Sequence, residues 1–113
     1  MLRLLRSAFF LALAVTFVMA ILPQPPQLPG APSDKFQHIL AFATLAGLGA
    51  VAFPRLRWWR LVAGLALFGA LIELVQAIPT LHRDSDAIDF IADVLAAALA
   101  GAAARGAMQR MKD

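Results

Sequence analysis

The sequence predicts an all-α integral membrane protein, a bundle of four transmembrane helices with both termini on the inner side. Two observations support this prediction. Of the 113 residues, 61% are hydrophobic and only 15% are charged, and the apolar residues fall into four long runs. A soluble domain carries about 25% charged residues, and one of this length leaves much of its surface in water. Lipid is therefore the solvent that fits this composition.

The four apolar runs define the expected helices of a single membrane domain over residues 1–113. They cover residues 4–22, 36–53, 58–78 and 88–104. A helix needs about 17–25 residues to cross a bilayer, and it satisfies its own backbone hydrogen bonds in lipid. A membrane β-barrel requires alternating polar and apolar residues, which none of these runs shows. Prolines follow each of the first three runs and separate the expected helices.

The basic residues give the orientation. Eight of the ten lie at the start of the first run, around the start of the third, or after the fourth; they are Arg3, Arg6, Arg55, Arg57, Arg60, Arg105, Arg110 and Lys112. By the positive-inside rule these segments are cytoplasmic, and Trp58 and Trp59 between them are expected to anchor a helix at the interface. The predicted location is the bacterial plasma (inner) membrane, with several passes.

The first run has an alternative interpretation as a secretory signal peptide. It has a basic start, an apolar middle and a tolerable cleavage site at Val18-Met19-Ala20. Whether residues 1–22 are retained or cleaved therefore stays open at this point. In both interpretations the second helix begins on the outer side.

Two further features narrow the class of protein. The sequence has no cysteine, which excludes disulfides and thiolate metal sites. The net charge of +3 does not indicate a nucleic-acid partner, because the basic residues lie at the ends of apolar runs and not on one soluble face. Small residues at Ala97 and Gly101 predict close packing of the last helix against a neighbour.

The acidic residues indicate a polar site. All except Asp113 fall on the outer side of the predicted topology, and Glu73 and Asp93 lie well inside apolar helices. We expect these two carboxylates at equal depth in adjacent antiparallel helices. Ionisable groups inside a membrane are costly, face inward and mark functional sites by default. The expected partners of the pair are Lys35, His38 and Arg83.

The order of these residues resembles the VanZ-like family of bacterial membrane proteins, named for a teicoplanin-resistance protein. The matching segments, all between residues 34 and 103, are Asp34-Lys35-Phe36-Gln37-His38, Glu73-Leu74-Val75-Gln76, Arg83 and Asp89-Phe90-Ile91-Ala92-Asp93. Asp93 departs from the family pattern, which has Asn at this position. The resemblance implies a cell-envelope protein linked to glycopeptide antibiotic tolerance or resistance, and it supplies no reaction.

The candidate site comprises eight residues. The expected catalytic candidates are His38, Glu73, Asp89 and Asp93, and the expected ligand-binding candidates are Asp34, Lys35, Gln76 and Arg83. Structural alternatives exist for several of them: Asp34 as a helix cap, His38 as an interfacial histidine and Arg83 as a solvated loop residue.

Three functions remain open from the sequence. The first is an enzyme acting on a lipid-linked or cell-wall substrate, with His38 or Glu73 as base and Lys35 and Arg83 as anion ligands. The second is a non-catalytic binding or accessory protein. The third is a proton or solute pathway. The inner halves of the helices argue against this function, because they are apolar.

His38 with the carboxylates has ligand types suited to a divalent cation, but the spacing matches no standard motif, and no metal site is predicted. Membrane lipids are expected partners; cofactor and oligomeric state are not specified.

Overall fold

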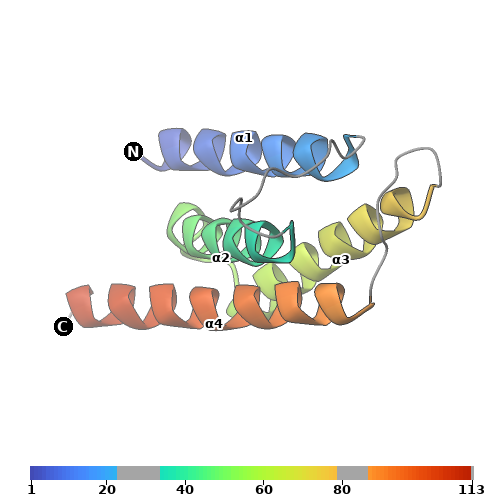
Figure 1. The fold of residues 1–113 in the computed structure, drawn as a ribbon. Helices are drawn as coiled ribbons and strands as arrows, with labels where there is room; N and C mark the ends of the chain where they lie inside the picture. Colours follow the sequence, from blue (N-terminus) through green and yellow to red (C-terminus); the bar gives the residue numbers. More distant parts are fainter. Residues whose placement is uncertain (23–33, 79–86, 113) are drawn as a thin grey trace.

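The computed structural model describes residues 1–22, 34–78 and 87–112, and within these ranges the side chains of residues 34, 35 and 112 are not described. The described part of the chain is all-helical. Its four helices are α1 (Leu2–Ile21), α2 (Asp34–Ala52), α3 (Trp58–Gln76) and α4 (Ala87–Lys112) (Figure 1). The predicted all-α fold with four helices is therefore confirmed.

Three of these helices are long and apolar enough to cross a membrane, which indicates a membrane protein. They are α1, α3 and α4, whereas the apolar part of α2, Phe36–Ala52, is shorter. Large apolar side chains on the outer surface fit this conclusion, since Leu4, Leu67 and Leu99 are 76%, 74% and 72% exposed. A surface this apolar is stable in lipid and would aggregate in water. The fourth span and the direction of insertion stay predictions.

The helix ends agree with the sequence prediction except at the end of α4. This helix runs to Lys112, eight residues beyond the expected end at residue 104. The apolar run does stop there, but the following segment contains no proline and consists mostly of residues with good helix propensity. Loss of hydrophobicity marks where a helix leaves lipid, and it does not end the helix.

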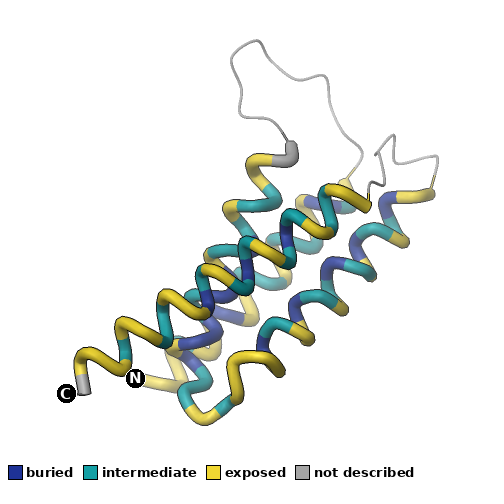
Figure 2. The backbone as a smooth tube through the Cα atoms, turned by 90° about the horizontal axis from the view of Figure 1, so that it is seen from below, coloured by how far each residue is buried: buried dark blue, intermediate teal, exposed yellow. Residues whose placement is uncertain are grey.

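The helices alternate in direction, so that both termini lie at one end of the bundle (Figure 1). α2 is central: it packs most extensively against α4 and also contacts α1 and α3, while α3 packs mainly against α4. Most of the fully buried side chains belong to α2, and Phe42 and Leu45, at 1% exposure, are the largest of them. Figure 2 shows the buried positions turned toward the centre of the bundle. α1 buries only Phe9 and Ala20, as expected for a peripheral helix.

Arginines from α1 and α4 bind the C-terminal carbonyl groups of α2. The last carbonyls of a helix have no partner within the helix, and Pro54 cannot continue the hydrogen-bonded ladder. Arg6 Nε donates to the Ala52 carbonyl at 2.9 Å. Arg105 Nη2 donates to the Phe53 carbonyl at 2.8 Å, and its Nη1 lies 3.4 Å from the Pro54 carbonyl. These contacts join three helices at the basic end of the bundle.

Trp58 fixes the contact between the start of α3 and α4. Its indole Nε1 donates to the Ala98 carbonyl at 3.1 Å, and its ring lies directly over Gly101, where an added Cβ would be 3.2 Å from Nε1. The predicted close packing at Ala97 and Gly101 is confirmed, because Ala97 is fully buried and Gly101 is buried against the indole.

Candidate functional site

The register of α2 and α4 places His38 level with Asp93. The two helices run in the same direction (Figure 1), and a Cβ at Gly101 would lie 3.8 Å from the Cβ of Ala46. Ala46 and Gly101 are therefore level with each other. His38 precedes Ala46 by eight residues and Asp93 precedes Gly101 by eight residues, so both lie about 12 Å further toward the other end of the bundle.

His38 and Asp93 also continue the rows of side chains through which α2 and α4 touch. Residues four apart share one helix face, and Phe42 and Ala46, which follow His38 at this spacing, are 1% and 0% exposed. Asp93 itself is only 3% exposed, while His38 is half-buried. Both residues are engaged in interactions. The interface between α2 and α4 thus contains a buried carboxylate and a histidine at the same level.

Asp89 extends this polar end of the interface by one turn. It precedes Asp93 by four residues on the same face of α4 and is half-buried. The Oδ1 atoms of both Asp89 and Asp93 are inaccessible to solvent. The structure therefore brings together His38, Asp93 and Asp89, three of the four expected catalytic candidates, along one helix–helix contact.

Glu73 lies nearer the end of the bundle than Asp93 does. The prediction that these two carboxylates lie at equal depth is therefore wrong. Gly69 of α3 faces Phe90 of α4, because a Cβ at Gly69 would lie 3.4 Å from the Phe90 ring. Glu73 is four residues outward of Gly69 and Asp93 is three residues inward of Phe90, so their Cα atoms differ in depth by about 10 Å. The prediction assumed matching helix ends, whereas Glu73 lies three residues from the end of α3 and Asp93 lies six residues after the start of α4.

Glu73 instead lines a pocket of about 400 Å³ between the end of α3 and the start of α4. The lining residues are Ala70, Glu73, Leu74, Ala77, Ala87 and Phe90. Side chains on a helix lean toward its N-terminus, so Glu73 leans inward on α3 and Asp93 leans outward on α4. The ring of Phe90 lies between these two levels. Glu73 thus lines a pocket at the end of the bundle opposite the termini, at a different level from Asp93.

Gln76 serves a different contact from the one expected. Its side chain is 2% exposed, and its Nε2 donates to the Ala20 carbonyl at the end of α1 at 3.0 Å. A buried amide with this partner satisfies one of the carbonyls that the end of α1 leaves open. Gln76 therefore joins α3 to α1, and its Nε2 points to α1.

The remaining predicted ligand-binding residues lie wholly or partly outside the described residues. Arg83 falls in the segment between α3 and α4, which the structure does not describe. Asp34 and Lys35 begin α2, and the register with α4 places the backbone of Asp34 level with Asp89. Their side chains are not described. The part of the site that the structure describes is therefore acidic, with one histidine.

The alternative of a metal site finds no support in the described part of the chain. Within residues 1–22, 34–78 and 87–112, no three or more histidine, cysteine or acidic side chains are grouped so that they could hold a metal ion.

The arginines at the other end of the bundle have a structural role that was not predicted from the sequence. Arg6 and Arg105 were interpreted only as orientation signals, yet both bind carbonyl groups at the end of α2. A usable signal was present in Pro54, since a proline just after a helix leaves C-terminal carbonyls that cationic side chains bind well.

Comparison of the chain with known protein families, with curated proteins and with solved structures finds no match. The fold and the site define its class as an all-helical protein, apolar enough for a membrane, with a buried carboxylate in its central helix contact.

Proposed function

We propose that this chain is a multi-pass protein of the bacterial plasma membrane whose outer side carries a polar site for a lipid-linked or cell-wall ligand. The observation that supports this most directly is Asp93, a carboxylate only 3% exposed in the central helix contact and level with His38. The resemblance to the VanZ-like family supports the same proposal and links the site to glycopeptide tolerance.

The cost of Asp93 supports a function for the site. An aspartate costs about 2.5–3.5 kcal/mol at the centre of a membrane helix on insertion scales and less toward the helix start, where Asp93 lies; a large apolar side chain contributes about 0.3–0.6 kcal/mol favourably. An apolar residue at position 93 would make a more stable contact with α2. The carboxylate of Asp93, level with His38, is therefore explained best by a role in contacting a ligand.

The chemistry available at this site is that of hydrogen-bond acceptance and proton transfer. A histidine beside a carboxylate can serve as a general base, because the carboxylate orients the ring and stabilises its protonated form. Since the described groups are acidic, binding of a phosphate-bearing ligand would depend on Lys35 and Arg83. Glu73, which lines the pocket between α3 and α4, would then contact a ligand bound in that pocket.

A non-catalytic binding or accessory protein is the second candidate. In it, the polar residues of the site would hold a ligand or a partner without converting it. A proton or solute pathway has less support, because the core of α2 from Phe42 to Ala52 is apolar in the described structure.

The proposal is tested by expressing the protein in a glycopeptide-sensitive bacterium. We expect His38→Ala and Asp93→Ala to lose most of any tolerance gained, at unchanged protein level. Thr44→Val is the matched control, because the Thr44 hydroxyl donates only to the Leu40 carbonyl of its own helix at 2.8 Å. Full tolerance in both site variants would reject the site.

A second measurement separates the two candidates. Lipid extracted with the purified protein is identified by mass spectrometry for the wild type and for His38→Ala. A binding protein loses a specific lipid in the variant, whereas an enzyme lacking its base retains unconverted substrate. The same extract from Asp93→Asn tests the departure from the family pattern, and the resemblance predicts that this variant keeps its function.

A further inference from the structure

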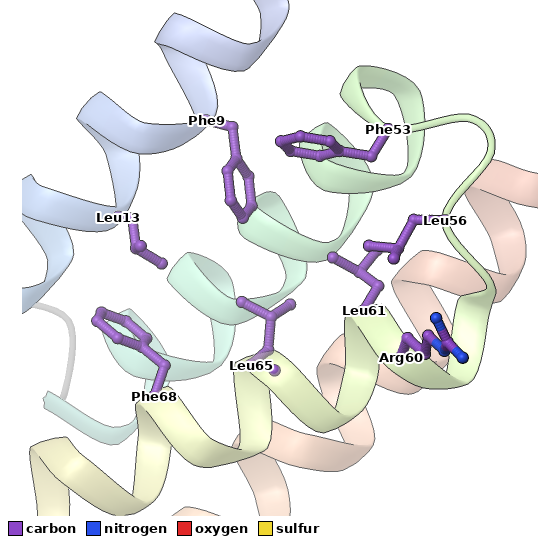
Figure 3. Close-up of a pocket in the computed structure, with 9 residues that line it drawn as sticks. Phe9, Leu13, Phe53, Leu56, Arg60, Leu61, Leu65 and Phe68 are labelled. Atoms are coloured by element: carbon purple, nitrogen blue, oxygen red, sulfur yellow. The ribbon is translucent and has the colours of Figure 1, made fainter.

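A second, apolar pocket lies at the basic end of the bundle, away from the site described above. Its volume is about 280 Å³, and it is lined by Phe9, Leu13, Phe53, Leu56, Arg60, Leu61, Gly64, Leu65 and Phe68. Figure 3 shows Phe9 and Leu13 of α1 facing Leu65 and Phe68 of α3, with Arg60 at the edge. Arg60 is the one charged residue among these lining residues.

We propose that this pocket binds one acyl chain of an anionic phospholipid from the inner leaflet, with Arg60 at its phosphate. Along α3 the pocket extends from Arg60 to Phe68, which is about 12 Å at 1.5 Å per residue. One leaflet of the hydrocarbon core is about 15 Å thick. A chain that enters beside Arg60 can therefore run along the pocket to about the middle of the bilayer.

Gly64 keeps the pocket open. An added Cβ at this position would meet no atom within 4 Å, although the glycine lies in the middle of α3. Glycine in a helix interior is less favourable than alanine, and no close approach of another helix requires it here. An open space at this residue is useful to an occupant that is not part of the chain.

Charge selects the kind of lipid. Arg60 is exposed, and its Cζ lies 5.3 Å from the centre of the Trp59 ring. A planar arginine held over an aromatic ring presents its donors to a phosphate in a fixed direction. Arg55 and Arg57 lie on the connection that precedes α3, so further positive charge lies near this end of the pocket and favours an anionic headgroup.

The test uses the full chain in vesicles with equal amounts of phosphatidylglycerol and phosphatidylcholine, analysed by native mass spectrometry after release. We expect the wild type to retain one phospholipid, with phosphatidylglycerol preferred about fivefold, the effect of about one arginine near an anionic surface. Gly64→Leu fills the pocket and should reduce retention to the level of adventitious adducts. Gly47→Leu is the matched control, since Gly47 in α2 is equally open and does not line the pocket.

The headgroup contact is tested separately. Arg60→Gln should retain one lipid and lose the preference for phosphatidylglycerol. Arg55→Gln, on the connection before α3 and outside the pocket lining, should keep most of this preference. Equal retention by Gly64→Leu and the wild type would overturn the pocket, and equal loss of preference in both arginine variants would overturn the role of Arg60. If Gly64→Leu loses its helix content, Leu13→Phe fills the pocket from α1 and decides the question. The outer site shares no residue with this pocket, so the two proposals fail independently.

Discussion

Gly101 offers the sharpest test of the contact between α3 and α4. An added Cβ there would lie 3.2 Å from Nε1 and 3.3 Å from Cδ1 of Trp58, closer than ordinary van der Waals contact. In Gly101→Leu three further carbons must fit between the indole and α4. Overpacking of this kind costs about 1–3 kcal/mol, and displacement of Trp58 loses a hydrogen bond worth about 1 kcal/mol.

Helix propensity acts in the opposite direction and sets the control. Replacing a glycine by leucine inside a helix contributes up to about 0.8 kcal/mol, so the net loss for Gly101→Leu is about 1–3 kcal/mol. Gly106→Leu on the same helix receives the same propensity gain, and a Cβ at Gly106 meets nothing within 4 Å. This control should be unchanged or slightly more stable than the wild type.

The assay is the free energy of unfolding in mixed detergent micelles, followed by helical circular dichroism. Tryptophan emission provides a second readout, because Trp58 and Trp59 are the only two tryptophans in the sequence. We expect the emission of Gly101→Leu to shift as the indole moves and that of Gly106→Leu to stay constant. Equal stability of the two variants with unchanged emission would refute the packing described for Trp58.

Three other predictions concern stability and topology. Arg105→Met should lower the free energy of unfolding by about 2–4 kcal/mol. It removes a charged hydrogen bond to the Phe53 carbonyl, worth about 1.5–3 kcal/mol, and a longer, weaker one to the Pro54 carbonyl. Arg110→Met, at an exposed position, should stay within about 0.5 kcal/mol of the wild type, and equal effects of the two substitutions would contradict the role of Arg105. Gln76→Leu should lower the free energy of unfolding by about 1–3 kcal/mol, because it leaves the buried Ala20 carbonyl without its donor. Chemical denaturation measures this loss. Single cysteines near the two termini should both resist a membrane-impermeant thiol reagent added to intact cells; labelling of either one would reject the predicted orientation.

Much of the fold was predictable from the sequence, because a segment that crosses a lipid bilayer must be long, apolar and helical. Hydrophobic run length and proline position located four helices, and the ends of α1, α2 and α3 agree with the structure to within about two residues. The end of α4 was not predictable from hydrophobicity, since polar residues such as Gln109 and Arg110 continue a helix as readily as apolar ones.

The candidate site was predictable only in composition. Spacing placed Asp89 and Asp93 on one face, and the structure confirms that both are at least partly buried. The spacing could not give the depth of Glu73, because relative depth depends on the register between α3 and α4. That register is determined by Gly69 against Phe90 and by Trp58 over Gly101, contacts between residues far apart in the sequence.

Gln76 shows a second limit of sequence reasoning. Its position three residues after Glu73 correctly places the two on neighbouring faces, but no periodicity tells which helix each face meets. The partner of Gln76 is the Ala20 carbonyl, a backbone group that carries no sequence signal.

The length of α4 has a mechanical consequence. At 26 residues it measures about 39 Å, which exceeds the hydrocarbon thickness of about 30 Å. Arg105 is tied to the end of α2, so the excess cannot be absorbed by sliding α4 through the bundle. The helical turns after Arg105 must therefore either extend beyond the hydrocarbon region or be accommodated by a tilt of the whole bundle. In a thicker bilayer, less of this segment would extend beyond the headgroups.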